Sequence, residues 1–186
     1  MNQSFENRFG WPEVIRVGSV TMVDVPDFRT VTVEALAAMI RSRALSATAV
    51  TDAALARIDR SNDTVNAFVA VNDSEARSQA AVLDARIAAG DDVGPLAGIP
   101  IGVKDLEDVA GFRTTRGAMH LADSAQVDTD STEVARLRAA GCVVIGKTNT
   151  PEAGWIGDTF NSVFGATKNP WDLERSPGGS SGGTSA

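Results

Sequence analysis

Apolar residues recur at helical spacing in the first part of the chain, after residues that favour helix N-caps. Thr32 precedes a predicted helix that extends to about Arg43, and Ser46 begins a second one. A short extended piece at residues 67–71 follows. The pattern therefore predicts two amphipathic helices that lead into a strand.

A third helical pattern begins after this extended piece. Asn72 or Asp73 supplies its N-cap, and Gly90 follows its last turn as a C-cap glycine. The next residues form a polar turn. Up to this point the chain is rich in alanine and mainly helical.

Short apolar runs then alternate with helical patterns. Residues 99–103 and 142–145 each predict a buried strand, and the helix between them, residues 134–140, has Asp130 and Glu133 as a capping box. Such alternation favours an α/β fold in which helices cover both faces of a sheet.

The remaining segments are less regular. Thr150 and Pro151 have the N-cap and N1 pattern of a further helix. Residues 168–186 have no periodicity, and their closing glycine-rich stretch predicts neither a helix nor a strand. Residues 1–28 also lack a period, so we interpret them as an N-terminal arm that precedes the beginning of a single domain, residues 29–186.

Composition excludes several classes of protein. The net charge of −7 argues against a nucleic-acid binder and against attraction to anionic lipid. The single cysteine, Cys142, allows neither an intrachain disulfide nor a zinc cage. Without a long apolar run or a signal-peptide pattern, a cytoplasmic protein outside the membrane is expected.

Lysine is rare in this chain, so each lysine is a candidate for chemistry. There are three lysines against fourteen arginines, and Lys104 ends the strand predicted at residues 99–103. It either reaches solvent or a carboxylate, or it is a desolvated neutral amine that can act as a base. Asp105 is not an automatic partner, because neighbours in a strand point to opposite faces.

The glycine-serine tract near residue 180 has two interpretations. Such composition is typical of a flexible linker. Alternatively, its glycines allow close backbone approach, and Ser180 and Ser181 present hydroxyl groups to a ligand.

Residues 141–148 fit the spacing of a phosphate-binding P-loop with Lys147 as its lysine. A P-loop needs a loop between its glycines, whereas the sequence here predicts a strand. The predicted strand argues against a P-loop. A nucleotide-binding protein that uses residues 141–148 is kept as an alternative function from another class, because the spacing matches.

Three blocks of sequence together resemble the amidase signature family. They comprise residues 94–105, 136–149 and 169–183, and the match extends from about Thr30 to Ala186. The resemblance implies an amidase that hydrolyses a small-molecule carboxylic amide to an acid and ammonia or an amine. It also implies an α/β fold with a central mixed β-sheet flanked by helices and incomplete at the C-terminus. It implies no metal and no organic cofactor.

The resemblance also assigns roles to residues. Lys104 matches the catalytic lysine, and Ser180 matches the bridging serine, which the family holds on a cis peptide bond. Gly179 and Ser181 are candidates for substrate binding. The nucleophilic serine of the family falls beyond Ala186, so we expect these 186 residues to be inactive alone. The glutaminase subunit of a tRNA-dependent amidotransferase is an alternative, and a homodimer of the complete protein is left open.

Overall fold

The computed structural model describes residues 25–186. Most of the predicted arm, residues 1–28, thus lies outside the described residues, as does the N-terminal stretch that lacks a signal-peptide pattern. Val25 and Phe28, at the end of the arm, pack against the larger hydrophobic core. The boundary between arm and domain stays a prediction.

Three helices in the first part of the chain begin at the predicted caps. They are α1 (Val33–Arg41), α2 (Ala47–Val65) and α3 (Asp73–Ala89). The side chains of Thr32, Ser46 and Asn72 each accept a hydrogen bond from a backbone N–H in the first turn of the helix that follows. Gly90 ends α3 with φ +85°, a conformation that favours glycine. The predicted starts of these helices are therefore confirmed.

The central sheet has three strands and is mixed, as predicted. The strands are β1 (Phe68–Val71), β2 (Pro100–Lys104) and β3 (Val143–Thr148), in the order β1-β3-β2. β3 pairs antiparallel with β1 and parallel with β2. The register places Lys104, the last residue of β2, beside Thr148, the last residue of β3. Both strands therefore deliver their final side chains to the same end of the sheet.

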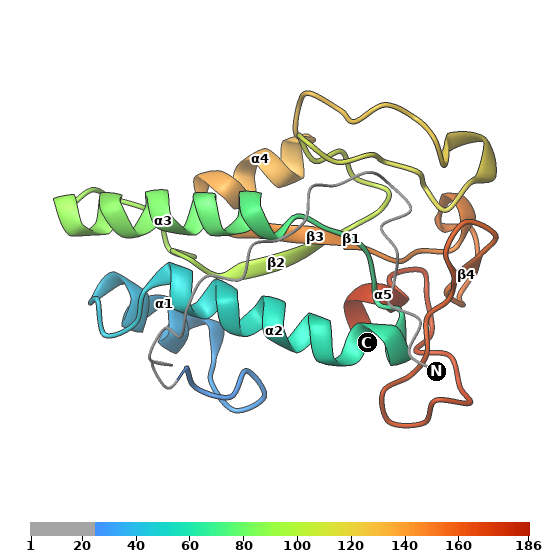
Figure 1. Cartoon of the computed structure of the whole chain (residues 1–186), viewed down its shortest axis with the longest axis horizontal. Coiled ribbons are helices and arrows are strands. Elements are labelled where there is room, and N and C mark those ends of the chain that lie inside the picture. Colours follow the sequence, from blue (N-terminus) through green and yellow to red (C-terminus); the bar gives the residue numbers. More distant parts are fainter. Residues whose placement is uncertain (1–24) are drawn as a thin grey trace, which may run out of the picture.

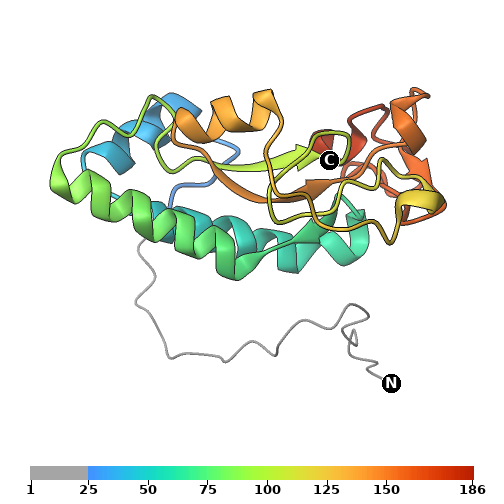
Figure 2. The same cartoon turned by 90° about the horizontal axis from the view of Figure 1, so that it is seen from above.

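Hydrophobic residues cover both faces of this sheet. Val143 belongs to a large cluster with α1, α2 and α3, whereas its neighbour Val144 belongs to a smaller one with Val134 of α4 (Thr132–Ala139). Neighbours in a strand point to opposite faces, so the two clusters lie on opposite sides of the sheet. Figure 2 shows this layering, with α2 and α3 on one side of the strands and α4, in orange, on the other.

The predicted capping box of α4 is wrong, because Glu133 lies at N2 of the helix and not at N3. Ser131, not Asp130, is the N-cap, and its hydroxyl accepts from Val134 N. Asp130 instead accepts from Ala110 N at 2.8 Å and lies 2.9 Å from Arg138 Nε. The Asp130 carboxylate, which the local pattern assigned to the cap, thus binds a backbone amide of a distant loop and forms an ion pair with Arg138 instead.

The helix predicted after Thr150 is also wrong. Pro151 precedes only a 3₁₀ turn, η2 (Glu152–Gly154), in which Ala153 has φ +51° and interrupts the helical path. The remaining short elements are η1 (Met119–Leu121), β4 (Phe160–Asn161) and β5 (Gly165–Ala166). The glycine-rich end, predicted to be irregular, forms one helical turn, α5 (Gly182–Ser185), packed near the ends of β2 and β3 (Figure 1).

Candidate active site

Lys104 and Ser180 meet at the end of the sheet. Lys104 Nζ lies 2.7 Å from Ser180 Oγ, within hydrogen-bonding distance, although the two residues are 76 positions apart in the chain. β2 ends at Lys104, and the glycine-rich loop before α5 carries Ser180. The peptide bond between Gly179 and Ser180 is cis, as the sequence resemblance implied.

The surroundings of Lys104 favour its neutral form. The side chain is half-buried, and this burial lowers the pKa of the amine from its ordinary value because desolvation disfavours the charged form. Within residues 25–186 no carboxylate forms an ion pair with Lys104. The arrangement can therefore hold an uncharged amine against a serine hydroxyl, which is the requirement for a lysine base.

Two buried threonines hold the loop that carries Ser180. Thr150 Oγ1 lies 3.2 Å from the Ser180 carbonyl oxygen, to which it donates. Thr159 Oγ1 donates to the Gly178 carbonyl oxygen at 2.8 Å and accepts from Gly182 N at 3.0 Å. The backbone is thus fixed before, at and after the serine. Neither threonine was predicted as a site residue, since an isolated threonine gives no sequence signal.

Gly179 and Ser181 occupy different environments. A Cβ atom at Gly179 would lie 2.5 Å from the Asp158 carbonyl oxygen, so this position has no room for a side chain. Ser181 is exposed, and its carbonyl oxygen accepts from Ser185 N in α5. The structure brings Gly179 beside Ser180, whereas the Ser181 hydroxyl makes no side-chain capping bond to α5. A substrate-binding role for either residue stays a prediction.

The buried partner of Asp105, which is Lys147, was not predicted from the sequence. Lys147 Nζ lies 2.9 Å from Asp105 Oδ1, and the two side chains are 1% and 2% exposed. As the strand periodicity indicated, Asp105 does not pair with Lys104. The rarity of lysine and the position of Lys147 inside an apolar run were the signals that pointed to a buried ion pair.

The same geometry contradicts the nucleotide-binding alternative. Residues 143–148 form strand β3 and not a loop, so their amides are used in the sheet. Lys147 is fully buried, and its amine is occupied by Asp105 and by carbonyl oxygens. A P-loop lysine must reach a phosphate group, which this lysine cannot do. The prediction of nucleotide binding by residues 141–148 is therefore wrong.

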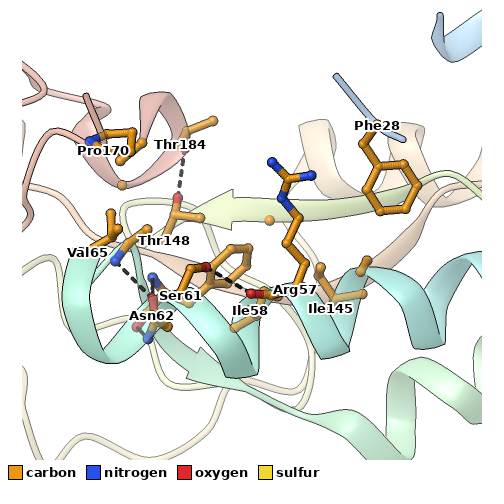
Figure 3. A pocket seen from close by; sticks show the side chains of 16 residues that line it. Phe28, Arg57, Ile58, Ser61, Asn62, Val65, Ile145, Thr148, Pro170 and Thr184 are labelled. Atoms are coloured by element: carbon orange, nitrogen blue, oxygen red, sulfur yellow. Dashed lines mark hydrogen bonds between the residues drawn. The ribbon is translucent and has the colours of Figure 1, made fainter. Parts of the chain in front are cut away.

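A cavity of about 330 Å³ lies beside this end of the sheet, between α2 and α5. Figure 3 shows its mainly apolar wall, with Arg57 and Asn62 from α2 and a hydrogen bond of 2.8 Å between Thr148 and Thr184. Neither Lys104 nor Ser180 lines this cavity. The structure therefore does not bring the lysine–serine pair and the cavity into one pocket.

The part of the chain that the structure describes holds neither a metal-binding cluster nor a membrane-spanning helix. In residues 25–186 no group of three or more histidine, cysteine, aspartate or glutamate side chains is arranged to hold a metal ion. Over the same residues, no helix combines the length and the apolar character that crossing a bilayer requires.

Comparison with known proteins identifies relatives over most of the chain. The family model described as Amidase matches residues 49–186. A glutamyl-tRNA(Gln) amidotransferase subunit from Salinispora tropica is 46% identical over 151 residues, which are 81% of this chain and 30% of that protein. An acylamidase from Rhodococcus erythropolis is 42% identical over 151 residues, covering 81% of this chain and 31% of the acylamidase.

Solved structures give the same result. A bacterial aryl acylamidase of the amidase signature family matches with a TM-score of 0.77 and 33% identity, over 82% of this chain and 32% of that one. The 6-aminohexanoate cyclic dimer hydrolase complexed with substrate matches with a TM-score of 0.73 and 36% identity, over 82% and 30%. The chain spans about a third of the length of these relatives. It belongs to the amidase signature family.

Proposed function

We propose that the protein hydrolyses a carboxylic amide to an acid and ammonia or an amine, with Lys104 as the base and Ser180 as the group that relays the proton. The observation that carries this proposal is the 2.7 Å contact between Lys104 Nζ and Ser180 Oγ. Family membership supports the reaction class, since the relatives include an acylamidase and an amide-hydrolysing enzyme of the same fold.

The proposed mechanism begins with a proton transfer through the pair. Neutral Lys104 accepts the proton of Ser180 Oγ, which in turn accepts the proton of a nucleophilic serine. The nucleophile attacks the amide carbonyl carbon and forms a tetrahedral intermediate. When the C–N bond breaks, the leaving nitrogen takes a proton back through the same pair. Water then gives a proton to the pair and attacks the acyl-enzyme. The ester bond breaks, the serine oxygen takes the proton back from the pair, and the acid leaves.

In this proposal the nucleophile and most of the substrate pocket come from sequence beyond Ala186. Its support is the family resemblance and the length of the relatives, of which this chain spans about a third. The absence of turnover by the 186 residues alone stays a prediction. The experiments therefore use the product of the complete open reading frame that contains these residues, hereafter the complete protein.

The test is release of ammonia or amine from linear and aryl amides by the complete protein. Lys104→Ala and Ser180→Ala are compared with Lys168→Ala and Ser78→Ala, because Lys168 and Ser78 are exposed residues of the same types outside the proposed site. We expect the first two variants to lose at least ~100-fold in kcat/KM, the order that a general base contributes. Wild-type turnover that survives both substitutions would exclude the proposed roles.

A second candidate is the glutaminase subunit of a tRNA-dependent amidotransferase. The relative that is named as part of glutamyl-tRNA(Gln) amidotransferase is 46% identical, against 42% for the acylamidase. This difference is too small to separate two functions that share a hydrolytic step. L-glutamine hydrolysis that requires a copurifying protein favours the glutaminase, whereas turnover of acylamides by the isolated protein favours the amidase.

A further inference from the structure

A buried ion pair that the proposed reaction does not use lies next to Lys104. Asp105 follows Lys104 in the chain, and its partner Lys147 stands opposite Val103 in the register of β2 and β3. Asp105 is thus one residue from the proposed base along the chain. Lys147 is one residue from Thr148, which stands opposite Lys104 in the sheet.

Both members of this pair are fully hydrogen-bonded by the protein. Lys147 Nζ also donates to the Glu107 carbonyl oxygen at 2.8 Å and to Thr114 Oγ1 at 3.2 Å. Asp105 Oδ2 accepts from Thr115 N at 3.2 Å and from Thr115 Oγ1 at 2.5 Å. These bonds join the loop after β2 to strand β3, so the pair also fixes the position at which β2 ends.

The electrostatic consequence for Lys104 follows from the position of Asp105. A negative charge near an amine favours its protonated form, and the effect is strong where water is excluded. The positive charge of Lys147, at 2.9 Å, cancels the charge of Asp105. The pKa of Lys104 is lowered by burial.

Other charged groups lie on the segments around this end of the sheet. The loop after β2 and the segment after β3 carry both signs, and they supply Glu107, Asp108, Arg113, Arg116, Glu152 and Asp158. Asp105 and Lys147 differ from all of these because both are almost completely buried. Buried charges are screened less than exposed ones, so an imbalance within this pair would act over a longer range than one among the other groups.

We propose that Lys147 is a positioning residue whose charge neutralises Asp105 and thereby keeps the amine of Lys104 in its neutral, proton-accepting form. The proposal deepens the proposed function, on which it rests for the role of Lys104 as a base. The proposal states that the charge of Lys147 changes the protonation of Lys104. A merely structural role of the pair would not require this.

The experiment measures the protonation of Lys104 without turnover. The complete protein is labelled with trace acetic anhydride across a pH range, and the Lys104 peptide is quantified by mass spectrometry, with exposed Lys168 as internal reference. Three variants are compared with the wild type: Lys147→Met, Asp105→Asn and the double variant. A thermal melt checks that each one is folded.

The charge proposal predicts an upward shift of the Lys104 midpoint in only one of the two single variants. Lys147→Met leaves Asp105 uncompensated and shifts the labelling midpoint of Lys104 upward, on the order of one pH unit. Asp105→Asn removes the negative charge and gives no upward shift. The double variant, which has no net charge at this position, returns to the wild-type midpoint.

Loss of structure alone would expose Lys104 in both single variants and raise both midpoints. An upward shift in Asp105→Asn, or one that persists in the double variant, therefore overturns the proposal. An unchanged midpoint in folded Lys147→Met overturns it as well. If Lys147→Met does not fold, Lys147→Gln replaces it; if neither folds, an upward shift in Asp105→Asn still overturns the proposal. If the wild-type complete protein hydrolyses no amide, the proposed function is refuted. The labelling midpoint of Lys104 can still be measured in that case.

Discussion

Thr159 and Gly182 are joined by a hydrogen bond that closes the loop around Ser180. Gly182 N donates to Thr159 Oγ1 at 3.0 Å, and the same hydroxyl donates to the Gly178 carbonyl oxygen at 2.8 Å. Thr159 is fully buried, and a Cβ at Gly182 would collide with its hydroxyl oxygen. One hydroxyl therefore fixes the backbone on both sides of the serine.

Thr159→Val should destabilise this loop while it preserves side-chain shape. The substitution leaves the Gly178 carbonyl and the Gly182 amide without their partner, at a cost of about 1–3 kcal/mol for each buried group. We expect a lower unfolding midpoint and lower kcat/KM. Thr159→Ser keeps the hydroxyl and serves as control. Equal activity of the valine and serine variants would show that the hydroxyl does not position Ser180.

Gly183→Ala should be strongly destabilising. Its Cβ would collide with Asn149 N and would lie 2.5 Å from the Ala67 carbonyl oxygen, and backbone atoms cannot move aside cheaply. Overpacking of this kind costs typically about 1–3 kcal/mol. Denaturant unfolding measures the change. Gly157→Ala is the matched control, because nothing lies within 4 Å of that added atom, and a cost as large as that of Gly183→Ala would contradict the argument.

The thiol of Cys142 should be unreactive in the folded protein. Burial raises its pKa from 9.0 to about 11, since the thiolate is disfavoured away from water. At pH 8 we expect alkylation of the Cys142 peptide to be at least ~10-fold slower in the native than in the denatured protein. Rapid alkylation under native conditions would refute its burial.

The same shift gives stability a dependence on alkaline pH. A thiol whose pKa is raised by folding contributes stability that is fully present below pH 9 and is lost as the pH rises through about 11. The stability of Cys142→Ala, which lacks the titrating group, should fall less steeply with pH over this window. Identical slopes for the two proteins would contradict this assignment.

Local signals in the sequence predicted the parts of the fold that are locally determined. Thr32, Ser46 and Asn72 cap their helices because a cap involves only the backbone of the next turn. Asp130 did not cap α4, because Ala110 N and the Arg138 guanidinium bind its carboxylate from elsewhere in the fold. A short-range pattern carries no information about such partners.

The candidate site shows the same difference between features that local sequence determines and features that depend on tertiary contacts. Lys104 and Ser180 were found through their motifs, and the structure brings them to 2.7 Å. Thr159 and Thr150 hold the loop of Ser180, and Lys147 pairs with Asp105, through contacts that only the tertiary structure creates. The glycine-rich segment forms the turn α5 because Gly183 packs against Asn149 and Ala67, a close approach that composition alone does not predict.

The final prediction concerns the pH dependence of the proposed reaction. A base must be unprotonated, so kcat/KM should rise with pH as Lys104 loses its proton. Because burial lowers the pKa of Lys104, the midpoint of this limb should lie below 10.5, the ordinary value for lysine.

Lys104→Arg provides the sharp comparison. The guanidinium remains protonated at every accessible pH, so the variant should lack the rising limb and retain at most ~1% of wild-type kcat/KM. Lys168→Arg, at an exposed position, should keep the wild-type profile. A rising limb of unchanged midpoint in Lys104→Arg would assign the titration to another group and remove Lys104 from the mechanism.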